Sequence, residues 1–83
     1  MIEDKIRELE LMRFKISKWL HLKMYDGLDE LERLTDMDID VDMALIKLKS
    51  GTMTRNYVKN ELDVLYSGFR EHYRRYEKSS KSP

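Results

Sequence analysis

The chain has 83 residues, and its sixteen Lys and Arg residues balance sixteen Asp and Glu residues. It has no cysteine, which excludes disulfide scaffolds and zinc–thiolate sites. Charged residues make up 39% of the chain and hydrophobic residues 41%, and the apolar share is too high for a disordered chain. There is no apolar run of the ~18 residues that a membrane span needs, and the start of the chain does not resemble a signal peptide. We therefore expect one cytoplasmic helical-bundle domain over residues 1–78, followed by a disordered polar tail over residues 79–83.

The N-terminal third of the chain predicts one long amphipathic helix from Ile2 to Tyr25. Its apolar residues recur every three or four positions, so they share one face of a helix that turns ~100° per residue. That face consists of Ile2, Ile6, Leu9, Met12, Ile16, Trp19, Leu20 and Met24. The dipeptide Asp26-Gly27 is a strong turn signal and is expected to separate this helix from the next segment.

The middle of the chain predicts two short helices. Leucines at positions 28, 31 and 34 favour a helix over residues 28–34, whereas residues 36–43 alternate acidic with apolar side chains. Alternation is typical of a strand, but a lone strand has no partner. We therefore predict an extended linker that leads into a second short helix, with Asp38 or Asp40 as its N-cap and its end near Lys49. Gly51 then suits the positive φ that follows a helix end.

The clearest period in the sequence predicts a second long helix of about 24 residues towards the C-terminus. Its apolar face consists of Val58, Leu62, Leu65, Phe69, His72, Tyr73 and Tyr76. The pair Ser67-Gly68 lies within this helix and predicts a bend or a close helix contact there. The expected fold is all-α, a small helical bundle of two long antiparallel helices joined by two short helices.

A second apolar stripe lies opposite the main face of the first helix. It consists of Leu11, Phe14, Leu22 and Tyr25. Either this helix is central and covered on both sides, or the stripe is an interface in a homodimer or with another protein. A patch of this kind is large for so small a domain, and association is a common remedy for a small core. The main hypothesis is therefore a non-enzymatic protein–protein interaction module, of adaptor or inhibitor type, that binds its partner through these four residues. Small chains of this type are common in accessory genomes such as those of viruses.

Charge is unevenly distributed and supports an alternative hypothesis. The last predicted helix carries Arg70, Arg74, Arg75 and Lys78, interleaved with His72, Tyr73 and Tyr76. Cations that meet phosphates and rings that stack on bases are typical of nucleic-acid binding. The alternative is thus a dimeric regulator that binds DNA or RNA through these four cations. Against it, the two tyrosines continue the apolar face, and cations also suit a helix C-terminus.

No catalytic, metal or cofactor site is expected. The only histidines, His21 and His72, lack the spacing of a helical metal motif, and the three glycines form no phosphate-binding loop. Residues 36–42 begin like a calcium loop, but Val41 stands where the loop needs glycine and Lys47 where it needs glutamate. This acidic segment is either a solvated loop or a surface for a basic protein, and the sequence leaves both readings open.

Overall fold

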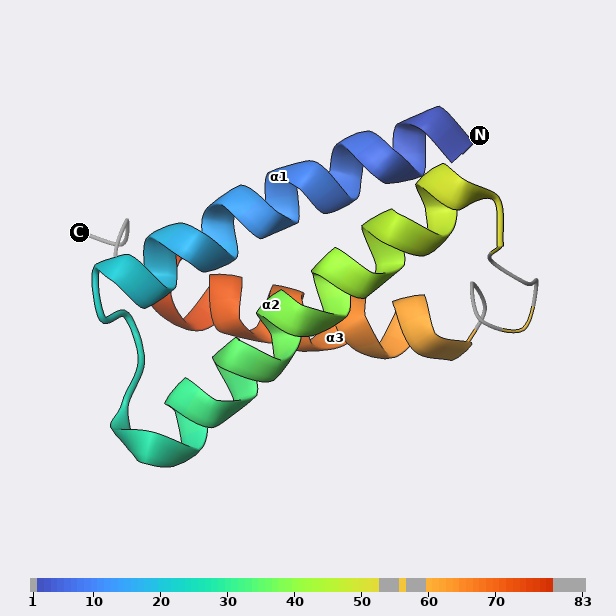
Figure 1. Ribbon diagram of the computed structural model, residues 1–83. Coiled ribbons are helices and arrows are strands. Elements are labelled where there is room, and N and C mark those ends of the chain that lie inside the picture. Colours follow the sequence, from blue (N-terminus) through green and yellow to red (C-terminus); the bar gives the residue numbers. More distant parts are fainter. Residues whose placement is uncertain (1, 53–55, 57–59, 79–83) are drawn as a thin grey trace.

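The computed structural model describes residues 2–52, 56 and 60–78, and within them every regular element is helical. Figure 1 shows three helices, α1 (Ile2–His21), α2 (Gly27–Ser50) and α3 (Leu62–Tyr73), and a π-helical segment, Arg74–Lys78, continues α3. The all-α prediction is therefore confirmed. The predicted disordered tail over residues 79–83 and the predicted helical residue Val58 lie outside the described residues.

The prediction of two short helices joined by a linker is wrong. Residues 27–50 form one continuous helix, α2, of 24 residues. The residue at its N-terminal cap is Asp26 rather than Asp38 or Asp40. The alternation that suggested extended chain is produced by two apolar rows on one helix. Met37 and Val41, four residues apart, pack in the core, whereas Ile39 and Met43, also four apart, are exposed.

Both α1 and α2 end in the same backbone motif. At the end of α1, Lys23 adopts φ 55°, and the Met24 amide donates to the Trp19 carbonyl at 2.8 Å. At the end of α2, Gly51 adopts φ 73°, and the Thr52 amide donates to the Lys47 carbonyl at 3.1 Å. A left-handed residue of this kind satisfies the last helix carbonyls. It stops α1 at His21, four residues before the predicted end, and it confirms the predicted role of Gly51.

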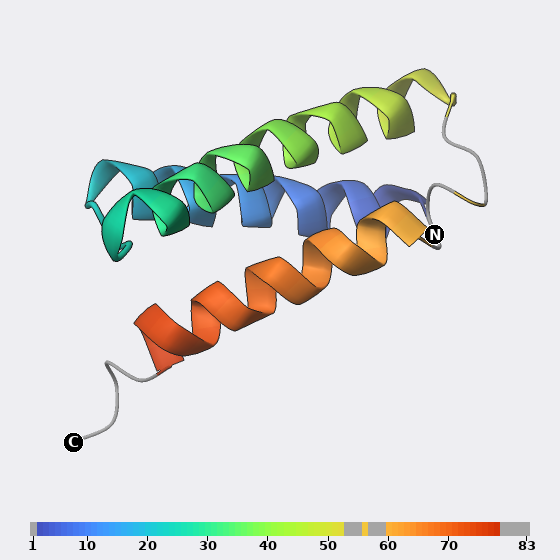
Figure 2. The ribbon, with the colours of Figure 1, turned by 90° about the horizontal axis from the view of Figure 1, so that it is seen from below.

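The three helices form a bundle in which α1 lies over the seam between α2 and α3. Figures 1 and 2 show α1 and α2 running antiparallel, and α3 also packs against α2. The helix α1 packs more closely on α2 than on α3. The buried core consists of Leu9, Met12, Ile16, Trp19, Leu34, Val41, Ala44, Leu45, Leu48, Leu62 and Leu65. Apart from Ile2, whose side chain lies outside the described residues, the main apolar face predicted for the first helix is thus its core face.

Gly68 sits at a close contact between α3 and α2, as its position in the predicted helix suggested. A Cβ atom at Gly68 would lie 3.7 Å from the Met37 Cε, an ordinary van der Waals distance. We therefore expect Gly68→Ala to raise the free energy of unfolding by about 0.5–1 kcal/mol, because alanine suits a helix interior better than glycine. Gly51→Ala is the matched control. The positive φ of Gly51 disfavours a side chain, so this variant should lose about 1 kcal/mol. Urea unfolding followed by circular dichroism measures both, and a loss in Gly68→Ala would contradict the expectation.

Candidate interaction surface

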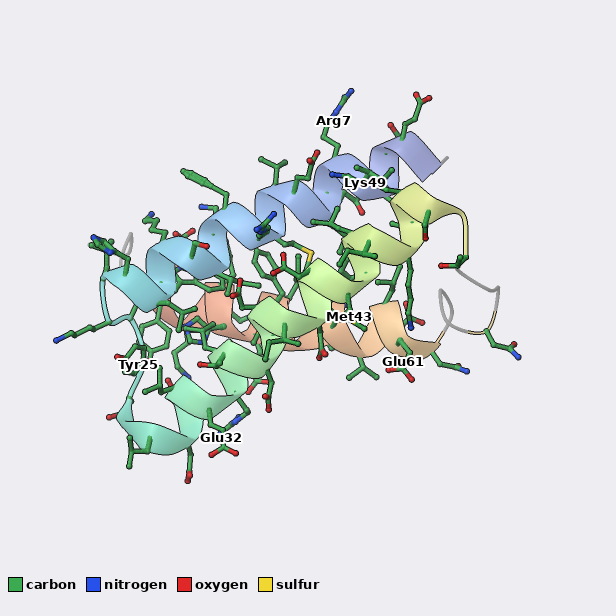
Figure 3. All side chains as sticks on the ribbon, viewed as in Figure 1. Arg7, Tyr25, Glu32, Met43, Lys49 and Glu61 are labelled. Carbon is green, nitrogen blue, oxygen red and sulfur yellow. The ribbon has the colours of Figure 1, made fainter. Side chains whose placement is uncertain are left out.

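The second stripe predicted on the first helix is largely exposed. Leu11 and Phe14 are each 64% exposed and Leu22 is 56% exposed. Tyr25 differs, because it is partly buried against the core at the connection between α1 and α2 (Figure 3). The alternative in which the first helix is covered on both sides is therefore wrong for Leu11, Phe14 and Leu22, because none of the described residues buries them.

A groove runs between α1 and α3, and Leu11 forms part of its wall. Its volume is about 550 Å³, within the ~300–1,000 Å³ that binding sites occupy. Its lining consists of Lys5, Glu8, Leu11, Met12, Lys15, Tyr66, Phe69, Arg70 and Tyr73. Three of these residues are aromatic and come from α3, which lies farther from α1 than α2 does. The sequence placed Phe69 and Tyr73 on the core face, and their position at the edge of that face also exposes them to the groove.

The rim of the groove carries more positive than negative charge. The Lys5 Nζ lies 5.9 Å from the centre of the Tyr66 ring, and the Lys15 Nζ lies 5.2 Å from the centre of the Tyr73 ring. These are cation–π distances. Arg70 is a third cation at the rim, against one carboxylate, Glu8. The groove therefore combines apolar and aromatic walls with a positive border.

Glu8 is held against the wall of the groove by Tyr66, whose hydroxyl donates to the Glu8 carboxylate at 3.3 Å. Partial burial, followed by the nearby Glu8 charge, raises the pKa of the Tyr66 hydroxyl above its ordinary value. The Tyr66 hydroxyl therefore stays protonated at neutral pH. Glu8 is the one acidic residue of the groove lining, and of the three cations there Lys15 is also paired with Glu77 at 2.6 Å.

A second exposed apolar row runs along the outer side of α2 and was not found from the sequence. We call it the α2 stripe. It consists of Ile39, Met43 and Ile46, which are 47–63% exposed. Their spacing of four and three residues places them on one side of the helix. Figure 3 labels Met43, the middle residue of this stripe, on α2. This spacing was visible in the sequence but was hidden by the assignment of residues 36–40 to a linker.

Carboxylates border the α2 stripe. Asp36 and Asp40 are exposed beside it, and Asp42 pairs with Arg13 of α1 at 2.9 Å. Burial raises the pKa of the Asp40 carboxyl above its ordinary value, and the neighbouring charges of Asp36 and Glu61 add to that effect. The carboxylates along this side of α2 therefore add to the effect of burial at Asp40.

The four cations proposed for nucleic-acid binding do not act as one free set. Arg75 donates to the Glu30 carboxylate on α2, and Arg74 also has an interaction partner within the chain. Arg70 lies at the rim of the groove between α1 and α3. The side chain of Lys78 lies outside the described residues. Tyr76, which the sequence placed on the apolar face, is partly buried, and its hydroxyl donates to Glu30.

Two buried glutamates hold the C-terminal segment against the rest of the bundle. Glu77 accepts hydrogen bonds from the Lys15 Nζ at 2.6 Å, the Lys18 Nζ at 3.0 Å and the Trp19 Nε1 at 3.3 Å. Burial alone raises the pKa of the Glu77 carboxyl, but these three bonds together outweigh it and hold that pKa below its ordinary value. Glu77 thereby joins the π-helical segment to α1.

Glu30 makes the corresponding link to α2. It accepts hydrogen bonds from the Tyr76 hydroxyl, the Arg75 guanidinium and the Asp26 amide, the last at 2.9 Å. The bond from Tyr76 has the largest effect on the pKa of the Glu30 carboxyl, which is lowered despite burial. The His72 Nε2 lies beside these groups and donates to the Met24 carbonyl at 2.8 Å. This polar cluster is fully engaged in holding the helices together and has the character of a structural clasp.

No family model, no curated protein and no solved structure matches the chain. Among the described residues, no three His, Cys, Asp or Glu side chains gather as a metal site would require. None of the described helices combines the length and apolar character needed to cross a membrane.

Proposed function

We propose that this chain is a non-enzymatic protein-interaction module that docks onto its partner through the exposed apolar face of α1. The observation that carries the proposal is the exposure of Phe14 and Leu11, each 64% exposed on a helix whose other face packs in the core. An adaptor or inhibitor role in the cytoplasm, as in small accessory proteins, belongs to the same proposal.

The energetics support a docking role for this face. Complete burial of a Leu or Phe side chain is worth about 1.5–3 kcal/mol relative to exposure. Burial of Leu11, Phe14 and Leu22 against a partner would therefore contribute several kcal/mol to the free energy of binding. Aromatic side chains that fill a partner's pocket often dominate binding, so Phe14 is the expected anchor.

Site-specific photocrosslinking in the native host tests the proposal. A photoreactive amino acid at position 14 should give one discrete adduct with a protein. The same amino acid at position 67 is the control, because Ser67 is exposed on α3 and belongs neither to the exposed face of α1 nor to the α2 stripe. Equal adducts at both positions, or none at position 14, would count against docking through α1.

Polar substitution should separate docking from folding. We expect Phe14→Ser and Leu22→Ser to abolish the adduct while the free energy of unfolding changes by no more than about 0.5 kcal/mol, because both side chains are already exposed. Circular dichroism checks the fold. If helicity collapses in these variants, the stripe belongs to the core and the proposal loses its basis.

The nucleic-acid alternative has less support. Arg75 is paired with Glu30, and the Tyr76 hydroxyl donates to the same carboxylate, so both groups already have a partner within the chain. It predicts retention on DNA or RNA that weakens steeply with salt. A lack of retention at low salt would remove it.

A further inference from the structure

Two exposed apolar surfaces of this chain carry opposite charge. The groove between α1 and α3 has a rim with Lys5 and Arg70, together with Lys15, whose charge is largely compensated by Glu77. The α2 stripe is bordered by Asp36 and Asp40. Each surface alone lacks a partner within the described residues, but the two are complementary to each other in charge and are both apolar in their centre.

The two surfaces also match in form. The α2 stripe presents side chains at positions i, i+4 and i+7 of a helix, which is the pattern that helices use when they bind in grooves. The groove is an open hollow with a volume of about 550 Å³ between two helices, and Tyr66, Phe69 and Tyr73 lie along one of its walls. A helix with an apolar row bordered by carboxylates is therefore the ligand that this groove fits best.

The groove and the stripe lie on different sides of the bundle. Ile39 and Ile46 lie roughly 140–160° around α2 from Val41, which packs in the core towards α1 and α3. The stripe thus turns away from the two helices that form the groove. One copy cannot fill its own groove, and contact between copies is heterologous, because each copy contributes a different surface.

We propose that copies of this chain associate head to tail, with the α2 stripe of one copy bound in the groove between α1 and α3 of the next. This inference rests on the proposed function, because Leu11 of the docking face forms part of the groove, and it names a second copy as the partner. A balanced formal charge of zero allows copies to approach, and the separation of acidic from basic surfaces orients them. Because each joined pair leaves one groove and one stripe open, the association continues beyond a dimer.

Light scattering of the full chain provides the first test. The average mass should rise with concentration past twice the 10.1 kDa of the monomer, and it should fall when salt screens the charges. A mass that stays at the monomer value up to about 1 mM protein would overturn the proposal, because even an association with a dissociation constant near 1 mM would be visible there. That result would leave the proposed function standing if position 14 still crosslinks to another protein.

Mixing two blocked variants provides the decisive test. Leu11→Ser with Arg70→Glu blocks the groove, and Ile39→Ser with Ile46→Ser blocks the stripe. Each variant alone should be a monomer, whereas an equal mixture should form a one-to-one pair, since one copy keeps its stripe and the other its groove. A wild-type dimer that does not grow, or a mixture that stays monomeric, would overturn head-to-tail association. All four side chains are exposed, so circular dichroism should show unchanged helicity.

A charge exchange keeps the test independent of the apolar substitutions. Arg70→Glu and Asp40→Lys should each weaken the association of the full chain at least tenfold. A mixture of the two should recover part of it, because the new lysine of one copy then faces the new glutamate of another. If both variants associate as the wild type does, the charges have no role and the proposed orientation is wrong.

Discussion

Replacing Trp19 by alanine is expected to lower the free energy of unfolding by about 3–5 kcal/mol. The Trp19 side chain is fully buried, and its ring lies 5.1 Å from that of Phe69 and 4.6 Å from that of His72. The substitution leaves a cavity between α1 and α3 and also removes the donor that reaches Glu77. Small domains have about 5–15 kcal/mol of total stability, so this single change should leave little of it.

Phe14→Ala is the matched control for Trp19→Ala, because both residues are aromatic and lie on α1. Phe14 is 64% exposed, so its loss should change the free energy of unfolding by no more than about 0.5 kcal/mol. Urea unfolding at neutral pH, followed by circular dichroism, compares the two variants. Comparable losses in both would mean that α1 has no distinct core and surface faces, and the proposed docking role would fail with that distinction.

The contrast between Trp19 and Phe14 was predictable because it depends only on helical period. Trp19 falls on the row that begins at Ile2, and Phe14 falls opposite it, so the identity of the core face follows from spacing alone. The same argument placed Leu62, Leu65 and His72 on the buried side of α3, where the structure has them. A regular period of apolar residues over many positions is a strong signal, because each further apolar residue that falls on the same helix face supports the assignment of that face to the core.

The continuity of α2 was not predictable by the same argument because two apolar rows share that helix. When Ile39 and Met43 are read together with Met37 and Val41, the apolar residues alternate with aspartates and imitate a strand. The inner row alone, continued by Ala44 and Leu45, has helical spacing. Aspartate also has a low helix propensity and a preference for caps, which favoured the linker interpretation. The packing of the inner row against α1 overrides that local preference.

The hydrogen bonds of the buried glutamates Glu30 and Glu77 could not be predicted, because their partners are distant in sequence. Glu77 bonds to Lys15, 62 residues away, and Glu30 bonds to Tyr76, 46 residues away. With sixteen acidic and sixteen basic residues, pattern alone does not select a pair. Lys23 posed a similar difficulty, since a lysine with φ 55° gives no local signal of the turn that it forms. Such features arise only after the helices have been placed together.

The paired glutamates lead to the second large expected effect, a loss of stability in acid. The pKa values of the Glu30 and Glu77 carboxyls are both lowered in the folded chain. A lowered folded pKa stabilises the fold above the ordinary pKa of glutamate, about 4.5 in both cases. That stabilisation is lost as the pH falls through the lowered values. We expect Glu30→Gln with Glu77→Gln to cost about 2–4 kcal/mol at pH 7, since each substitution weakens several charge-assisted hydrogen bonds.

The pH dependence of that cost is what identifies its cause. Glutamine resembles a protonated glutamate, so the difference between wild type and the double variant should shrink as the pH is lowered from about 5 and vanish once both wild-type carboxyls are protonated. Urea unfolding at a series of pH values measures it. Glu32→Gln is the control, because Glu32 is exposed and should show almost no difference at any pH. A cost that is the same at pH 7 and in strong acid would mean that packing, and not the carboxylate charge, holds the C-terminal segment to α1 and α2.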